Sequence, residues 1–138
     1  MNEAYTGGCA CGAIRYEISG EPIFSNDCQC RDCQSKSGTG HGSYLTFRGK
    51  RSVKHEGEAK HWDIAGDSGK VKTRAFCPTC GSPVYVTYRA TPDVLTIHAG
   101  SLDDPSRYKP QALTYSVRGY AWDHIDPALQ KFDKMPPS

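Results

Sequence analysis

The sequence predicts a mostly β protein, a sandwich of small antiparallel sheets with one or two short helices. Helical periodicity is nearly absent, whereas short apolar or alternating runs recur between Gly, Pro, Asp and Ser residues. Short strands at this spacing are typical of all-β sandwiches or of packed small sheets. Seven cysteines occur in three clusters, and such clusters are typical of zinc sites. We therefore expect a β fold that is clipped together by a structural zinc.

Eight runs have the composition of strands. In chain order they are residues 13–18, 23–27, 43–47, 60–64, 70–76, 83–88, 94–99 and 112–117. The alternation over 71–76 predicts a strand with one buried and one solvent-facing side.

Two segments have the character of short helices. The first is 31–37, which directly follows a cysteine cluster. The second is 127–132, where Asp126 would cap the helix and Pro127 would occupy its first position.

The composition describes one domain. A chain of 138 residues with 37% hydrophobic content suits a single domain over 1–138, with its core at about 5–133 and a flexible tail at 134–138. A net charge of +2 provides no basic stripe, so we expect no nucleic-acid partner. No stretch approaches the roughly 20 apolar residues that span a bilayer, and no signal peptide is visible. An odd number of cysteines disfavours a disulfide framework, so we expect a cytoplasmic protein.

Four cysteines have the spacing of a closed metal site. Cys9 and Cys11 form C-x-C between glycines, and Cys77 and Cys80 form C-x-x-C before Gly81. Positions i and i+2 of an extended chain face the same way, so both thiols of the first pair can reach one ion. One zinc at about 2.3 Å from each sulfur would clip the N-terminal segment to the later strands. Two disulfides or free thiols are the alternative.

Three further cysteines have the spacing of an open site. Cys28, Cys30 and Cys33 form C-x-C-x-x-C, where a strand gives way to the first predicted helix. Helix N-termini favour thiolates. Three thiolates leave one corner of a zinc open, as a reactive zinc requires, and a soft site of this kind prefers a sulfur ligand. A fourth ligand from Asp27, His41 or His61 would instead close the site, and one disulfide plus a free thiol would indicate redox chemistry.

The chain resembles the family of glutathione-dependent formaldehyde-activating enzymes and centromere protein V. The resemblance runs from about Tyr5 to Trp122. It is carried by Gly7-Gly8-Cys9-Ala10-Cys11-Gly12, by Cys28-Gln29-Cys30-Arg31-Asp32-Cys33-Gln34, by Phe76-Cys77-Pro78-Thr79-Cys80-Gly81 and by Gly100-Ser101-Leu102-Asp103-Asp104-Pro105. Gln29 stands where family members often carry His.

The resemblance implies an Mss4-like fold and two zinc ions per chain. The structural zinc would be held by Cys9, Cys11, Cys77 and Cys80, and the reactive zinc by Cys28, Cys30 and Cys33, which would be the catalytic residues. The implied activity is a carbon–sulfur lyase reaction on a thiol–aldehyde adduct such as S-hydroxymethylglutathione. The expected partner is thus a small thiol or its adduct. A non-catalytic zinc-stabilised binding module and a thiol-based reductase remain as alternatives.

Overall fold

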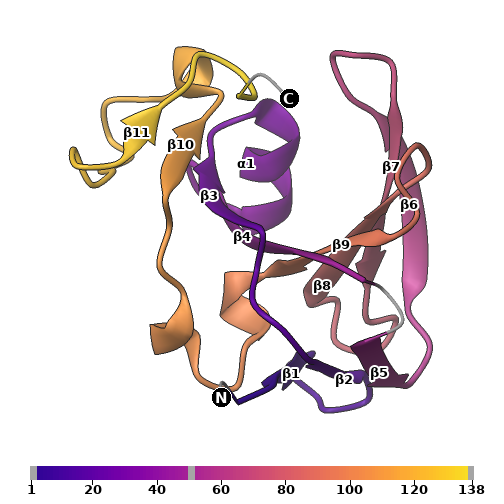
Figure 1. Cartoon of the computed structure of the whole chain (residues 1–138). Coiled ribbons are helices and arrows are strands. Elements are labelled where there is room, and N and C mark those ends of the chain that lie inside the picture. Colours follow the sequence, from indigo (N-terminus) through magenta and orange to yellow (C-terminus); the bar gives the residue numbers. More distant parts are fainter. Residues whose placement is uncertain (1–2, 50–51, 137–138) are drawn as a thin grey trace.

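The computed structural model describes residues 3–49 and 52–136. Within them the chain folds into a three-stranded sheet, an eight-stranded sheet and the helix α1 (Arg31–Ser37), which lies against the larger sheet (Figure 1). The strands are β1 (Tyr5–Gly8), β2 (Arg15–Ile18), β3 (Phe24–Cys28), β4 (Gly42–Arg48), β5 (Val53–Glu56), β6 (Lys60–Ala65), β7 (Val71–Phe76), β8 (Pro83–Tyr88), β9 (Val94–His98), β10 (Ala112–Thr114) and β11 (Gln130–Lys131). Short 3-10 helices lie at Ala99–Ser101, Pro105–Arg107 and Ser116–Arg118.

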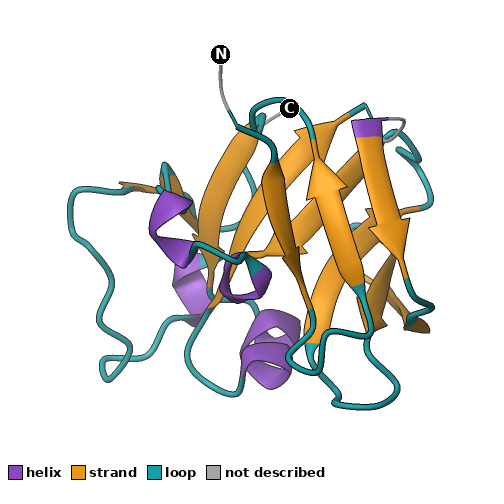
Figure 2. Cartoon of the chain, turned by 90° about the horizontal axis from the view of Figure 1, so that it is seen from below, coloured by secondary structure: helices purple, strands orange, loops and turns teal. Residues whose placement is uncertain are grey.

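The two sheets differ in their connectivity. The small sheet has the order β1-β2-β5 and is antiparallel. The large sheet has the order β11-β10-β3-β4-β9-β8-β7-β6, and its strands lie side by side in a curved arrangement (Figure 2). Its pairs are antiparallel except that β10 runs parallel to both β3 and β11. A long connection from β9 through 3-10 helices reaches β10, and crossovers of this length permit parallel pairing.

The predicted runs all contain strands, and the additional strands have weak local signals. β1 is half glycine, β5 is mostly polar, and β11 has two residues. Each is defined by its pairing with a neighbour rather than by its own composition. The mostly β fold of the expected kind is therefore confirmed, although the larger sheet is wider than a small sheet and is mixed in direction.

The second predicted helix, over 127–132, is wrong. Asp126 caps a single turn, accepting the Ala128 N–H at 2.9 Å through its side chain and the Leu129 N–H at 3.2 Å through its backbone. Gln130 and Lys131 then pair with β10 instead of continuing the turn. A tertiary strand pairing therefore overrides a local capping signal.

The eight-stranded sheet has two different faces because side chains alternate along each strand. Leu45 and Phe47 of β4 and Ile97 of β9 face the main core, which also takes in Tyr16 and Ile18 of the small sheet. The neighbouring residues on the same strands face the other way. This second face carries Tyr44, Thr46, Arg74, Val86 and Thr96, which line a pocket beside α1.

Candidate metal centres

The four-cysteine cluster joins two distant parts of the chain. The sulfurs of Cys9, Cys11, Cys77 and Cys80 all lie within 4.8 Å of one another. Cys9 and Cys11 follow β1, and the other two lie in the turn between β7 and β8. The Cys9–Cys11 sulfurs are 3.6 Å apart and the Cys11–Cys77 sulfurs are 3.7 Å apart. These separations match the roughly 3.8 Å expected for sulfurs about 2.3 Å from a tetrahedral zinc.

Backbone amides point at this cluster. The Ile14 N–H donates to Cys9 Sγ at 3.2 Å, and the N–H groups of Thr79 and Cys80 donate to Cys77 Sγ at 3.4 and 3.5 Å. Donors of this kind stabilise thiolates. The bond from Ile14 lowers the pKa of Cys9, and hydrogen bonding with Ser82 lowers the pKa of Cys80 to about 5. The tight turns that aim these amides use Gly12 and Gly81, which have φ values of 83° and 77°.

The three-cysteine cluster is local and fully buried. Cys28 ends β3, Cys30 is the N-cap of α1, and Cys33 lies in the first turn of α1. Their sulfurs lie within 4.8 Å of one another, and those of Cys30 and Cys33 are 2.8 Å apart without a bond. The Cys33 N–H donates to Cys30 Sγ at 3.2 Å, so the sulfur takes the place of the usual capping oxygen.

The three thiols share their protons. Hydrogen bonds from Cys28 and Cys33 lower the pKa of Cys30 to about 2. Hydrogen bonding of Cys28 with Cys30 and Cys33, together with burial, raises the pKa of Cys28. Cys30 is therefore the thiol of the three that its neighbours favour as a thiolate, and a bound metal ion would deprotonate its ligand thiols.

No fourth ligand joins this cluster from the described residues, 3–49 and 52–136. Asp27 accepts hydrogen bonds from Ser43 at 2.7 Å and from Tyr108 at 2.8 Å. His41 is paired with Asp123 at 2.9 Å. His61 is exposed on β6, with its ring 6.4 Å from that of Tyr85. The side chains that could have closed the site are thus engaged elsewhere.

The donor set and its surroundings suit a zinc with one free coordination position. The three sulfurs line a pocket of about 490 Å³ together with residues of β4, β7 and β8. To share a tetrahedral ion, Cys30 and Cys33 would separate by about 1 Å, to the roughly 3.8 Å spacing of zinc-bound sulfurs. Cys28, Cys30 and Cys33 would hold the ion, and the pocket would give a small molecule access to it.

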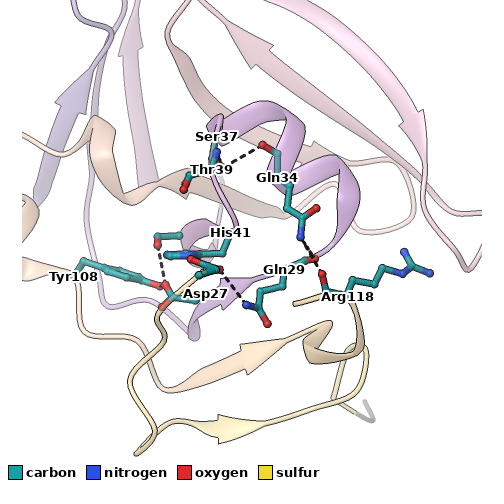
Figure 3. Close-up of polar contacts among 10 residues, drawn as sticks. Asp27, Gln29, Gln34, Ser37, Thr39, His41, Tyr108 and Arg118 are labelled. Carbon is teal, nitrogen blue, oxygen red and sulfur yellow. Dashed lines mark hydrogen bonds and ion pairs between the residues drawn. The ribbon is translucent and has the colours of Figure 1, made fainter. Parts of the chain in front are cut away.

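A polar network holds the C-x-C backbone between Cys28 and Cys30. Gln29 is buried, and its Nε2 donates to Asp123 Oδ2 at 3.0 Å, the same carboxylate that pairs with His41. Gln34 of α1 donates through Nε2 to the carbonyls of Gln29 at 3.0 Å and Arg118 at 3.1 Å (Figure 3). Gln29 therefore serves as a structural anchor for the loop that carries the ligands.

The pocket contains functional groups that the sequence did not single out. The strand signal over 70–76 indicated a solvent-facing side, yet Arg74 on β7 is only 5% exposed. Its Nε donates to Asp32 Oδ2 at 2.7 Å, and Lys72 approaches the same oxygen at 3.2 Å. Tyr115 also lines the pocket and has a left-handed backbone, with φ of 56°. The sequence did contain a pattern that could have indicated these groups: two basic residues lie two positions apart on a predicted strand beside a cysteine cluster.

The comparison with protein families agrees with this geometry. A model described as "glutathione-dependent formaldehyde-activating enzyme" (GFA) matches residues 4–118. The chain belongs to the GFA family. The match includes all seven cysteines of the two clusters. The mostly β fold with one short α-helix and two metal-suited cysteine clusters is consistent with the Mss4-like fold of this family.

A solved structure supports the fold of this GFA family member. A Rhodobacter sphaeroides protein, a structural-genomics target, superposes with a TM-score of 0.59 at 19% sequence identity. The alignment covers 79% of this chain and 99% of that one. No helix within residues 3–49 and 52–136 is long and apolar enough to cross a membrane.

Proposed function

We propose that this protein is a zinc-dependent enzyme of the carbon–sulfur lyase type that acts on a thiol–aldehyde adduct such as S-hydroxymethylglutathione. The observation that carries the proposal is the three-cysteine cluster, which converges at the wall of a pocket without a fourth ligand from the described residues. The four-cysteine cluster takes the structural zinc in this proposal. The proposed partner is a small thiol or its adduct, without nucleic acid or membrane, in the reducing cytoplasm.

The proposed reaction joins the thiol sulfur to the aldehyde carbon and moves the thiol proton to the carbonyl oxygen; the reverse reaction breaks the carbon–sulfur bond and returns the proton. When bound, zinc would supply an open coordination position at which a thiol is deprotonated. Cys28, Cys30 and Cys33 are buried at the pocket wall and would hold the ion there. Burial raises the pKa of Tyr44, so its hydroxyl stays protonated as a hydrogen-bond donor.

One observation favours a second candidate, a thiol-based reductase. Cys30 and Cys33 form a C-x-x-C at the start of a helix, their sulfurs are 2.8 Å apart, and the pKa of Cys30 is lowered to about 2 by its neighbouring thiols. Low-pKa thiolates in this position are typical of disulfide exchange. In that case the cluster would cycle between dithiol and disulfide and would bind no metal during turnover.

The deciding experiment measures metal content, free thiols and the response of the metal to added thiol. We expect two zinc ions per chain, and after cobalt substitution we expect thiol addition to change the sulfur-to-metal absorption of one metal only. Formaldehyde–thiol exchange should exceed the uncatalysed rate. One zinc ion per chain together with three reactive thiols would support the reductase. Two metal ions whose absorption no added thiol changes would support the non-catalytic binding module.

A further inference from the structure

Within the described part of the chain, Arg74 has one unsatisfied hydrogen-bond donor beside the three-cysteine cluster. Its guanidinium is buried, with Nε on Asp32 at 2.7 Å and Nη2 at 3.5 Å from the Tyr44 hydroxyl and 3.7 Å from Cys33 Sγ. Nη1 is also buried and has no hydrogen-bond partner among the described residues. An unpaired buried donor on a charged group is costly. A ligand that accepts from Nη1 would remove this cost.

The carboxylates around Arg74 do not neutralise all the cationic side chains of the pocket. Lys72 and Arg74 share one carboxylate, that of Asp32, at 3.2 and 2.7 Å. The pocket is lined by five cationic side chains and two carboxylates. The second carboxylate, Asp67, is already paired with Arg118 at 3.0 Å. The pocket wall therefore carries an excess of positive charge, which attracts an anionic small molecule.

We infer that Arg74 and Lys72 bind a carboxylate of the substrate, so that the thiol this enzyme uses is a mercapto acid. The inference rests on the proposed function, because it places the substrate sulfur at the three-cysteine site. Guanidinium groups suit carboxylates because their planar donors match the geometry of the two oxygens.

The distance between the two subsites limits the reach of the molecule. Arg74 Nη2 is 3.7 Å from Cys33 Sγ, and a substrate sulfur on the same tetrahedral ion would lie about 3.8 Å from that sulfur. A carboxylate oxygen about 2.9 Å from the guanidinium would therefore lie within about 10 Å of the substrate sulfur. The carboxylate of 3-mercaptopropionate falls within this reach, so this small thiol acid is a suitable probe of the subsite.

A purely structural role for Arg74 predicts a different pattern. If the guanidinium only balanced the cysteine thiolates, its removal would weaken metal binding and would affect all thiols equally. A carboxylate subsite instead changes the ratio of affinities between a thiol acid and its neutral analogue. The experiment therefore measures the ratio of the affinities for a thiol acid and its neutral analogue, and this measurement requires no catalytic turnover.

The experiment uses the full chain with cobalt in place of zinc and follows sulfur-to-metal absorption during thiol titration. The matched pair is 3-mercaptopropionate and 3-mercaptopropionamide, which differ in charge and hardly in size. We expect the wild type to bind the acid about tenfold more tightly, the range of a charge-assisted hydrogen bond.

Variants assign the effect to its residues. Arg74→Gln and Lys72→Gln should each bring the acid-to-amide ratio close to one; Lys72 is the less buried of the two and is the safer variant for folding. Lys70→Gln is the control, because Lys70 also lines the pocket but is exposed. It should keep the wild-type ratio within about twofold, since exposed charges are screened.

The outcomes separate this inference from the proposed function. Equal binding of acid and amide to the wild type overturns the carboxylate subsite while the metal-bound thiol stands. A Lys70→Gln loss equal to that of Lys72→Gln overturns it as well, because a general field would then explain the preference. An acid-to-amide ratio that Arg74→Gln leaves unchanged overturns the assignment of the subsite to Arg74. A cobalt spectrum that no thiol changes overturns the proposed function itself.

Discussion

The two cysteine clusters use the same ligand in two different settings. The four-cysteine cluster brings together distant residues such as Cys11 and Cys77, which are 66 positions apart, and its Cys9 and Cys77 belong to the main core. The three-cysteine cluster spans one short segment and packs in a small core of its own with Tyr44. One cluster therefore connects distant segments of the chain, and the other lies within one segment at the wall of a pocket.

The groups that contact the sulfurs also differ between the two clusters. Backbone amides surround the four-cysteine cluster and satisfy its sulfurs without involving a pocket cation. Charged side chains surround the three-cysteine cluster, with Arg74 in contact with Cys33 and Lys72 close behind it. Four thiolates complete the shell of a structural zinc, whereas three thiolates beside an unsatisfied guanidinium nitrogen leave room for a further ligand.

Cys77→Ser should cause the largest loss of stability among the variants that distinguish the two clusters. Structural zinc contributes about 10–16 kcal/mol of binding energy that is also folding energy, so the loss of one thiolate should leave the chain unfolded or insoluble. Expression, circular dichroism and thermal unfolding measure this effect. Cys30→Ser is the matched control and should remain folded. If the two variants lost equal stability, the division between a structural and a reactive site would be wrong.

Alanine at Cys28, Cys30 or Cys33 should abolish formaldehyde–thiol turnover while the fold persists. Each substitution removes a ligand from a site that already lacks a fourth protein donor, so each should also remove one metal ion per chain. Metal analysis and exchange spectroscopy of the thiol adduct measure the two effects. Retained turnover in any of the three folded variants would contradict the assignment of the reactive site.

His98 should make the pocket side of the molecule sensitive to acid. Its ring is buried 5.0 Å from that of Tyr44, and burial lowers its pKa from 6.5 to about 4. The unfolded chain binds this proton first, so stability falls as the pH falls from about 6.5 to 4. At about 1.4 kcal/mol per pKa unit, the loss amounts to about 3 kcal/mol.

Denaturant unfolding of His98→Gln between pH 7 and pH 4, compared with the wild type, measures this contribution. The variant should lose less stability over this range, because cysteine protonation is common to both proteins. His124→Gln should follow the wild-type curve, because this side chain is exposed. Identical curves for His98→Gln and the wild type would exclude the contribution of His98.

Gly119→Ala should disturb the three-cysteine side alone, with a cost of about 1 kcal/mol. A Cβ at Gly119 would collide with the Gln29 side chain, which anchors the loop between Cys28 and Cys30. Gly100→Ala is the matched control, because a Cβ there meets no atom within 4 Å. Thermal unfolding and cobalt spectra measure the result, and a changed signal from the four-cysteine metal would contradict the independence of the clusters.

Much of this molecule could be predicted from local patterns. The cysteine spacings identified both clusters because C-x-C and C-x-x-C confine their sulfurs within one turn of chain. The strand runs and the helix 31–37 followed from turn residues and from short-range alternation. Within the described residues the helix matches Arg31–Ser37, because Cys30 caps its start and Gly38, with φ of 76°, ends it.

Other features depend on contacts between distant segments. The alternation over 71–76 predicted one solvent-facing side for this strand, but Arg74 of β7 is buried because residues of α1 and β4 contact its side chain. Asp27, His41 and His61 were equal candidates for a fourth ligand until tertiary contacts with Tyr108, Asp123 and Tyr85 engaged them elsewhere. The cysteine spacing was sufficient to predict which residues can bind metal, because spacing limits local geometry. Only the packing of remote elements established which cluster lacks a fourth protein ligand among the described residues and which cationic side chain lies beside it, because burial and pairing arise when those elements pack.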